Sequence, residues 1–251
     1  MDKRLIAERF AQARNTYNRE AKVQGEVAAK MLRLLQPYCR EEHGRQVVEI
    51  GCGTGVYSRM LLQQLHPHRL LLNDLCPEME ECVSDLPARF LAGDAEGLPL
   101  PCDTRLITSC STLQWFVHPE AFFRHCYEAL TSEGLLAFST FGPDNLIEIK
   151  QLTGNGLTYP SLSELTEMLA PHFRLLHAEE ERATLCFEHP TAVLKHLKET
   201  GVTGTEKRVW TRGRLQAFCD EYIRQYSRPD GRVTLTYHPI YIIAQKTSDS
   251  L

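Results

Sequence analysis

The sequence lacks a long apolar run and an excess of positive charge. No stretch approaches the roughly 18 consecutive apolar residues of a membrane-spanning helix, and residues 1–10 lack an apolar core long enough for a signal peptide. The formal net charge is -4, whereas nucleic-acid-binding proteins usually carry a basic excess. We therefore expect a cytoplasmic protein that binds neither a membrane nor nucleic acid.

Paired cysteines and clustered metal ligands are also missing. The cysteines number nine, an odd count, and none forms a C-x-x-C pair. Cys52, Cys110 and Cys186 lie in apolar stretches, which is typical of reduced thiols rather than of disulfides or a zinc site. His66 and His68 lie close together, but no second cluster of ligands with metal spacing accompanies them. We expect no disulfide and no bound metal.

Alternating strands and helices dominate the middle of the chain. Short apolar segments of strand character are followed by amphipathic helical segments from residue 46 onward. We expect strands at 46–50, 69–73, 88–92, 105–110 and 134–141, and helices at 56–65, from 77 onward and at 119–130. This order predicts an α/β fold with a parallel, doubly wound sheet. The fifth strand is apolar on both faces, so we expect it inside the sheet.

The flanking segments carry further elements. Helical periodicity marks residues 3–14 and 19–36. Later we expect a helix at 161–169 with a capping box of Ser161 and Glu164, one or two strands at 173–187, helices at 191–200 and 212–226, and strands at 232–237 and 240–246. The length of 251 residues suits one compact domain. We divide it into an N-terminal helical flap (1–45), a core (46–187 and 232–251) and a helical cap inserted into the core (188–231).

A glycine-rich loop follows the first strand and opens a helix. Glycine permits positive φ angles and lets the backbone approach a ligand, although a tight strand-to-helix turn would use it too. The G-x-G-x-G spacing of Gly51, Gly53 and Gly55 departs from the G-x-G-x-x-G of dinucleotide-binding proteins. Glu49 disfavours a pyrophosphate and attracts a cation, and Asp74, closing the second strand, suits ribose hydroxyls. The loop therefore predicts a cationic nucleoside ligand without phosphate.

The pattern resembles the class I S-adenosylmethionine-dependent methyltransferases over about residues 45–142. The resemblance implies a Rossmann-like, mostly parallel seven-stranded sheet with an antiparallel last strand, and S-adenosylmethionine as cofactor. The glycine loop would lie against the methionine part, Asp74 would hold the ribose, Asp94 would meet the adenine amino group, and Met79 would pack on the adenine. The implied cofactor-binding residues are Glu49, Gly51, Gly53, Gly55, Asp74, Leu75, Met79, Asp94, Ala95 and Ser109. Asn73 and Cys76 depart from the small or apolar residue and the serine that relatives more often carry.

Segments outside this core narrow the resemblance. Residues 16–24, 111–116, 138–143, 196–201 and 235–238 together resemble the malonyl-acyl-carrier-protein O-methyltransferases of biotin synthesis. That family methylates the free carboxylate of a malonyl thioester, so that fatty-acid synthesis can extend it toward a pimeloyl chain. The resemblance runs from about residue 8 to residue 246. It implies malonyl-acyl carrier protein, or malonyl-coenzyme A, as the partner, and we expect a monomer.

The implied chemistry needs no acid or base from the protein. A carboxylate with a pKa near ~4 is ionised at neutral pH and can attack the sulfonium methyl directly. Positioning and exclusion of water would then account for the catalysis. We expect the orienting residues to be Tyr17, Gln24, Gln114 and Trp115. Tyr17 and Gln24 share one face if their stretch is a single helix, and Trp115 would serve equally well as a core residue.

A basic surface would suit the acidic carrier protein. The cap contains Lys195, Lys198, Lys207, Arg208, Arg212 and Arg214. We expect these residues to bind the carrier through charge complementarity, while a merely solvated face would have the same composition.

Three other functions stay open at this stage. A carboxyl methyltransferase acting on a free di- or tricarboxylic acid would need arginines inside the pocket and no basic cap. A non-catalytic nucleoside-binding protein would tend to lose residues such as Gly51, Asp74 and Asp94. A nucleic-acid methyltransferase would carry an Asn-Pro-Pro-Tyr or Asp-Pro-Pro-Tyr segment where Ser109-Cys-Ser-Thr112 stands.

Overall fold

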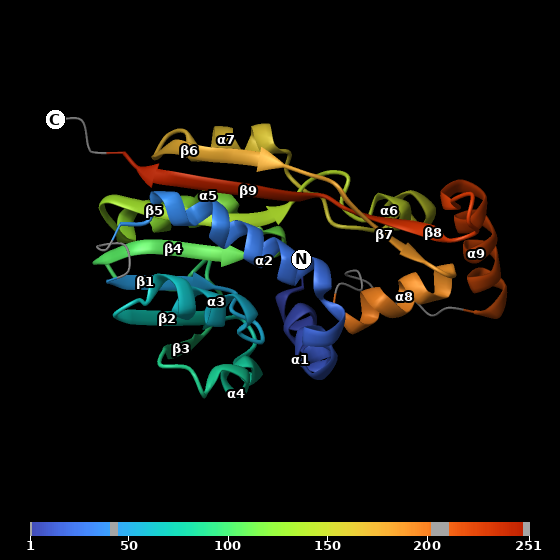
Figure 1. The fold of residues 1–251 in the computed structure, drawn as a ribbon, viewed down its shortest axis with the longest axis horizontal. Coiled ribbons are helices and arrows are strands. Elements are labelled where there is room, and N and C mark those ends of the chain that lie inside the picture. The colour runs from blue at the N-terminus through green and yellow to red at the C-terminus, as the bar shows by residue number, and fades with distance from the viewer. Residues whose placement is uncertain (1, 41–44, 202–210, 248–251) are drawn as a thin grey trace.

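The computed structural model describes residues 2–40, 45–201 and 211–247, apart from the side chains of residue 15 and residues 17–20 (Figure 1). The helices are α1 (Lys3–Glu20), α2 (Lys22–Leu35), α3 (Val56–Leu65), α4 (Glu80–Val83), α5 (Pro119–Ala129), α6 (Ile147–Thr153), α7 (Leu162–Leu169), α8 (Pro190–Glu199) and α9 (Arg212–Tyr226). The strands are β1 (Gln46–Ile50), β2 (Arg69–Asp74), β3 (Arg89–Ala92), β4 (Thr104–Cys110), β5 (Leu130–Phe141), β6 (Phe173–Glu180), β7 (Ala183–Phe187), β8 (Val233–Tyr237) and β9 (Pro239–Lys246).

Seven of these strands form one mixed sheet in the order β3-β2-β1-β4-β5-β9-β6. The first five strands along the chain run parallel to one another. The last strand, β9, is antiparallel to both of its neighbours, β5 and β6. The predicted doubly wound, mostly parallel sheet with an antiparallel last strand is therefore confirmed, and β5 lies inside it as predicted.

Alternate residues of each strand face opposite layers of helices. In β1, Val47 packs in the core that contains Leu35 of α2 and Leu61 of α3. The next residue, Val48, packs in the other core, which contains Phe123 of α5. Figure 1 shows α2 and α3 on one side of the sheet and α5 on the other. Because helices cover both faces, β1 is buried along its whole length.

Most predicted helices and strands begin and end close to the expected residues, and the differences have local causes. The capping box is confirmed, since Glu164 N–H donates to Ser161 Oγ at 3.2 Å and Ser161 N–H donates to Glu164 Oε2 at 2.7 Å. The helix expected from residue 77 is short, because a 3-10 turn precedes α4 and Pro87 follows it. Helix α6 was not predicted; it begins after a left-handed Leu146 and ends at a left-handed Gly154.

The N-terminal segment forms two helices, not one continuous helix through residue 24. Ala21 separates α1 from α2 with a non-helical ψ of 47°. The condition under which Tyr17 and Gln24 would share one helical face is therefore not met. Helix α2 lies on one face of the sheet and contacts β4, β5 and β9, while α1 contacts the 3-10 turn at Pro77–Met79 that follows the carboxyl end of β2. The predicted flap thus covers the edge of the sheet where ligands of this fold class bind.

A lobe projects from one end of the large sheet (Figure 1). Strands β7 and β8 pair antiparallel with each other and form a separate two-stranded sheet. Helices α6, α8 and α9 pack on it around the buried residues Val193, Tyr222 and Leu235. The division drawn from the sequence placed both strands in the core, whereas the strand pairing joins them to the helices of the cap. The domain boundaries themselves stay a prediction.

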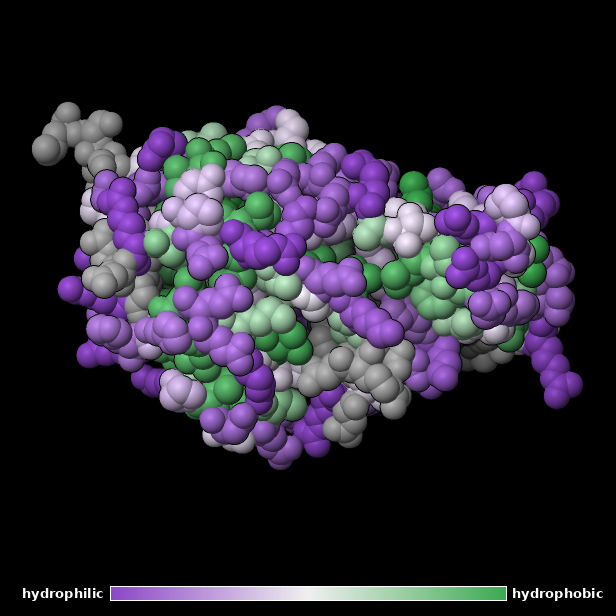
Figure 2. All heavy atoms as spheres, in the orientation of Figure 1, coloured by the Kyte–Doolittle hydropathy of each residue, from purple (hydrophilic) through white to green (hydrophobic). Residues whose placement is uncertain are grey.

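The surface is mixed in polarity. Figure 2 shows hydrophilic and hydrophobic residues interspersed over the face that carries α2. The large apolar side chains exposed among the described residues are Val117, Leu175 and Ile223, which lie in different elements. Within the described ranges, no helix combines the length and the apolar character that crossing a membrane requires.

Candidate active site

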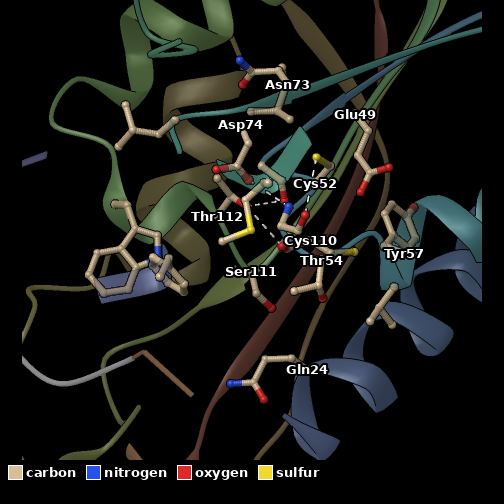
Figure 3. Close-up of a pocket in the computed structure, with 18 of the residues that line it drawn as sticks. Gln24, Glu49, Cys52, Thr54, Tyr57, Asn73, Asp74, Cys110, Ser111 and Thr112 are labelled. Carbon is tan, nitrogen blue, oxygen red and sulfur yellow. Dashed lines mark hydrogen bonds between the residues drawn. The ribbon is translucent and has the colours of Figure 1, made fainter. Parts of the chain in front are cut away.

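A cavity of about 240 Å³ opens at the carboxyl ends of β1, β2 and β4. The segments that follow these strands and β3 form its walls, and α1 and α2 cover it. In open α/β sheets, ligands bind where the strand order reverses, which here is between β1 and β4. Figure 3 shows side chains from both the sheet edge and α2 around this cavity.

The glycine loop presents bare backbone to the cavity. Gly51, Gly53 and Gly55 have φ angles of +70°, +52° and +81°. A Cβ at Gly51 would lie 2.1 Å from Thr112 Oγ1, so glycine is required by the close approach of the segment after β4. A Cβ at Gly53 would meet no atom within 4 Å, and Gly53 lines the cavity. The loop therefore leaves room for a ligand beside Gly53.

Asp74 links the glycine loop to the end of β2. Its Oδ2 accepts a hydrogen bond from Gly53 N–H at 2.8 Å and its Oδ1 accepts one from Cys76 N–H at 2.9 Å. Burial raises the pKa of the Asp74 carboxyl group, while these backbone N–H groups act in the opposite direction. Each carboxylate oxygen keeps a second lone pair, so Asp74 can still accept hydrogen bonds from a ribose.

The two residues beside Asp74 that depart from the family pattern have structural roles. Asn73 Nδ2 donates to the carbonyl oxygens of Leu91 at 3.0 Å and Gly93 at 2.9 Å. Asn73 therefore ties the end of β2 to the loop that carries Asp94. Cys76 contributes its backbone N–H to Asp74, so the identity of its side chain does not alter that contact.

Glu49 is a buried carboxyl group at the cavity wall (Figure 3). Only 1% of the residue is exposed, and its Oε2 has no hydrogen-bond partner among the described residues. Burial raises the pKa of Glu49 to about 8, and the negative charge of Asp74 adds to the rise. A ligand cation would favour the ionised form, so this buried carboxyl group with an unpartnered Oε2 fits a positively charged ligand.

Asp94 is held by the first residues of α1. Lys3 Nζ donates to Asp94 Oδ2 at 2.6 Å and also to Glu96. Glu96 in turn accepts hydrogen bonds from the backbone N–H groups of Val117 and His118. These contacts fasten the N-terminal flap to both the loop after β3 and the segment after β4.

The other predicted cofactor residues divide into two groups. Leu75, Met79 and Ala95 line the cavity. Gly55 and Ser109 do not line it. A Cβ at Gly55 would come within 2.7 Å of a Val83 side-chain atom, and Ser109 Oγ donates to the carbonyl oxygen of Ile50 at 2.8 Å. The structure thus gives Gly55 and Ser109 supporting positions behind the cavity wall, in place of the direct contact expected from the sequence.

A smaller cavity of about 20 Å³ shares part of this wall. Phe10, Gln24, Ser111 and Trp115 line both cavities, whereas Gln114 lines only the smaller one. The Trp115 ring packs edge-on against Phe10 with ring centroids 5.6 Å apart. The structure therefore brings together three of the four predicted orienting residues. The fourth, Tyr17, lies in α1, and its side chain is outside the described residues.

Four of the six residues of the predicted basic surface lie within the described parts of the chain. Lys195 and Lys198 lie on α8, Arg212 and Arg214 lie on α9, and all four are exposed. Lys195 forms a long i,i+4 ion pair of 3.8 Å with Glu199. Lys207 and Arg208 fall outside the described residues.

Sequence reasoning missed the contribution of α1 to the main cavity. Lys3, Phe10 and Arg14 all line the main cavity, and Arg14 Nη1 lies 3.2 Å from Glu81 Oε2. The helical periodicity of α1 placed Phe10 on a buried face, but it gave no reason to connect Lys3 with a carboxylate 91 residues away. In the described parts of the chain, no three His, Cys, Asp or Glu side chains are grouped so that they could hold a metal ion.

Known proteins share this architecture. The structure of the YcgJ protein from Bacillus subtilis superposes with a TM-score of 0.63 and 18% identity, covering 88% of this chain and 99% of that one. At this identity the likeness concerns the fold alone. The sequence profile of a methyltransferase domain matches residues 48–138, which contain the glycine loop, Asp74 and Asp94.

Two curated relatives match almost the whole chain. A malonyl-[acyl-carrier protein] O-methyltransferase of Bacteroides helcogenes is 59% identical over 98% of this chain and 99% of its own length. A protein of the same name from Bacteroides fragilis is 54% identical over 97% of this chain, which spans 50% of that longer relative. The chain therefore belongs to the family of malonyl-[acyl-carrier protein] O-methyltransferases.

Proposed function

We propose that the protein transfers the methyl group of S-adenosylmethionine to the free carboxylate of a malonyl thioester on acyl carrier protein. The product, a malonyl methyl ester, primes the pimeloyl chain of biotin. The observation that carries the proposal is the 59% identity to the Bacteroides helcogenes relative over nearly the full length of both chains. That length includes the residues of both cavities.

The main cavity fits S-adenosylmethionine on the chemistry of its residues. The buried Glu49 carboxyl group suits the positive charge of the ligand, and Gly53 leaves backbone exposed beside it. Asp74 would hold the ribose, while Asp94 and Met79 would hold the adenine. When bound, S-adenosylmethionine supplies a methyl group on a positively charged sulfur.

The protein's own residues need only bind, orient and exclude water. An acceptor carboxylate is ionised at neutral pH, with an ordinary pKa near ~4, so no residue has to remove a proton from it. Ile6 and Phe10 of α1 cover the cavity with apolar surface. Holding two reactants in one orientation can supply on the order of 7–11 kcal/mol of the barrier reduction.

The carrier protein is the proposed partner, and malonyl-coenzyme A is an alternative source of the same thioester. Lys195, Lys198, Arg212 and Arg214 would attract an acidic carrier to the exposed faces of α8 and α9. A monomeric state, a cytoplasmic location and activity without a metal stay predictions from the sequence.

Mass spectrometry of the carrier tests the reaction. After incubation with S-adenosylmethionine and the protein, malonyl-acyl carrier protein should gain the mass of one methylene group. No gain on the carrier, together with methylation of a free acid such as aconitate, would support the alternative carboxyl methyltransferase. Failure to bind S-adenosylmethionine by calorimetry would instead support a non-catalytic protein.

A further inference from the structure

Three buried polar atoms without partners lie in the wall that the two cavities share. They are Gln24 Oε1, Ser111 Oγ and Trp115 Nε1, and none has a hydrogen-bond partner among the described residues. All three residues line both the main and the smaller cavity. Leaving such atoms unpaired is costly, so their grouping points to a polar ligand that pairs with them.

The other polar side chains of the smaller cavity already have partners. Asn145 Nδ2 donates to Tyr159 OH at 3.0 Å, and Tyr237 OH lies 2.9 Å from His196 Nε2. Gln114 is also occupied, because its Nε2 donates to the carbonyl oxygen of Ser111 at 2.6 Å. Gln114 therefore supports the backbone of Ser111, while Ser111 and Trp115 keep their own donors free.

The backbone of Ser111 is held in an unusual conformation. Its φ of 55° is in the left-handed region, which is unfavourable for serine. The conformation is fixed by the bond from Ser111 N–H to Ser139 O at 3.0 Å and by the Gln114 contact. In Figure 3 the Ser111 side chain and Gln24 lie on the same side of the cavity. Strained residues of this kind persist where the surrounding structure enforces them, often at ligand sites.

We propose that Ser111 Oγ–H and Trp115 Nε1–H together bind the acceptor carboxylate. The assignment rests on the proposed function, because it takes the acceptor to be a carboxylate. Carboxylate oxygens only accept hydrogen bonds, and bonds to an ionised acceptor are stronger than those between neutral groups. Neutral donors also orient the carboxylate without the opposite charge of an arginine, which would stabilise its negative charge and so weaken it as a nucleophile.

The variant Ser111→Gly removes the hydroxyl donor and tests acceptor binding separately from the stability of the fold. Glycine accepts a φ of 55° without strain, so the variant should be at least as stable as the wild type in chemical denaturation. Its KM for malonyl-acyl carrier protein should rise by about tenfold to a hundredfold, while its Kd for S-adenosylmethionine stays unchanged. Trp115→Phe should raise the KM in the same way. Ser111→Asn, which tolerates positive φ and keeps an N–H donor, should recover part of the affinity.

Ser139→Ala is the matched control. Ser139 also has a buried hydroxyl group without a partner, but it lines neither cavity. Loss of the Ser139 hydroxyl group should leave the KM for malonyl-acyl carrier protein unchanged. An equal rise of this KM in Ser139→Ala and Ser111→Gly would overturn the proposal. A wild-type KM in Ser111→Gly would overturn it as well.

A binding measurement distinguishes this proposal from the proposed function. Malonyl-pantetheine is titrated into the protein with S-adenosylhomocysteine present, and binding should weaken in Ser111→Gly. If the wild type binds this probe through Ser111 but transfers no methyl group to the carrier, the proposed function fails and the carboxylate site stands. If the wild type methylates the carrier while Ser111→Gly binds the probe normally, the site is wrong and the function stands.

Discussion

The proposed donor side and the proposed acceptor side of the active site are built in different ways. The donor side comes from consecutive segments after β1, β2 and β3, and backbone groups define much of it. Gly51 and Gly53 adopt positive φ, and Asp74 accepts its bonds from backbone N–H groups. The acceptor side combines single side chains from distant elements, such as Phe10, Gln24 and Ser111.

This difference separates specificity for the methyl donor from specificity for the acceptor. A site made of backbone and local motifs tolerates little change, which suits a cofactor shared by many enzymes. A site made of side chains on separate elements can change one residue at a time while the fold is kept. The donor side therefore identifies the chemistry, and the acceptor side determines which molecule is methylated.

The largest expected effects come from substitutions in the glycine loop of the donor side. Gly51→Ala should lower the free energy of unfolding by about 2–4 kcal/mol, because its Cβ would lie 2.1 Å from Thr112 Oγ1 at positive φ. Gly53→Ala should cost only about 1 kcal/mol, because its Cβ meets no atom within 4 Å. It should nevertheless weaken S-adenosylmethionine binding about tenfold or more, since the methyl group occupies ligand space.

Urea denaturation and calorimetry measure the two quantities separately. Equal losses of stability in both variants would contradict the account of Gly51. Full affinity for S-adenosylmethionine in Gly53→Ala would contradict the account of the loop as a ligand surface.

Glu49 should have a smaller, pH-dependent effect on the affinity for S-adenosylmethionine. Because its pKa in the free protein is raised to about 8, most of the carboxyl group is protonated at pH 6, and binding a cation must release that proton. The affinity for S-adenosylmethionine should therefore rise as the pH increases from about 6 to 8. Glu49→Gln should bind about tenfold more weakly at pH 8 and should lose this rise.

The same variant tests the stability of the free protein. The folded-state pKa of Glu49, about 8, lies above the ordinary value of 4.5, so the unfolded chain releases this proton first and the free energy of unfolding falls as the pH rises between these two values. Glu49→Gln should lack that loss in urea denaturation. Identical pH profiles for the variant and the wild type, in binding and in stability, would show that Glu49 does not titrate in this range.

The smallest effect is expected on the lobe. Lys195→Glu with Lys198→Glu should raise the KM for malonyl-acyl carrier protein about threefold to tenfold at low salt, because exposed charges act mainly by attraction at a distance. The KM for malonyl-pantetheine should not change. Arg69→Glu, an exposed charge at the start of β2 away from the lobe, is the control. An equal effect of the control, or no effect at low salt, would remove the lobe as the docking surface.

The sequence identified the glycine loop and Asp74, which line the main cavity, because their signals are local. Strand periodicity, the glycine spacing and Asp74 all lie within single elements or adjacent ones. The same holds for the capping box at Ser161 and Glu164, which depends on residues three apart. The parallel, doubly wound character of the sheet followed from the alternation of strands and helices.

The sequence could not predict how distant segments meet. The bond from Lys3 to Asp94 and the separate pairing of β7 with β8 depend on tertiary contacts. The resemblance implied Ser109 as a cofactor residue, but in the folded chain its hydroxyl group donates to the carbonyl oxygen of Ile50 on the neighbouring strand. Residues 111–116 were connected with the acceptor by resemblance, but nothing singled out Ser111, since its positive φ and its unpaired hydroxyl group exist only in the folded chain.

The most direct test of the central claim compares two carriers that differ only at the acceptor group. Malonyl-acyl carrier protein and acetyl-acyl carrier protein are each incubated with the protein and isotopically labelled S-adenosylmethionine. The account predicts label on the malonyl carrier and none on the acetyl carrier, whose acyl group lacks a free carboxylate. Equal labelling of both carriers would place the methyl group elsewhere on the carrier and would contradict the account.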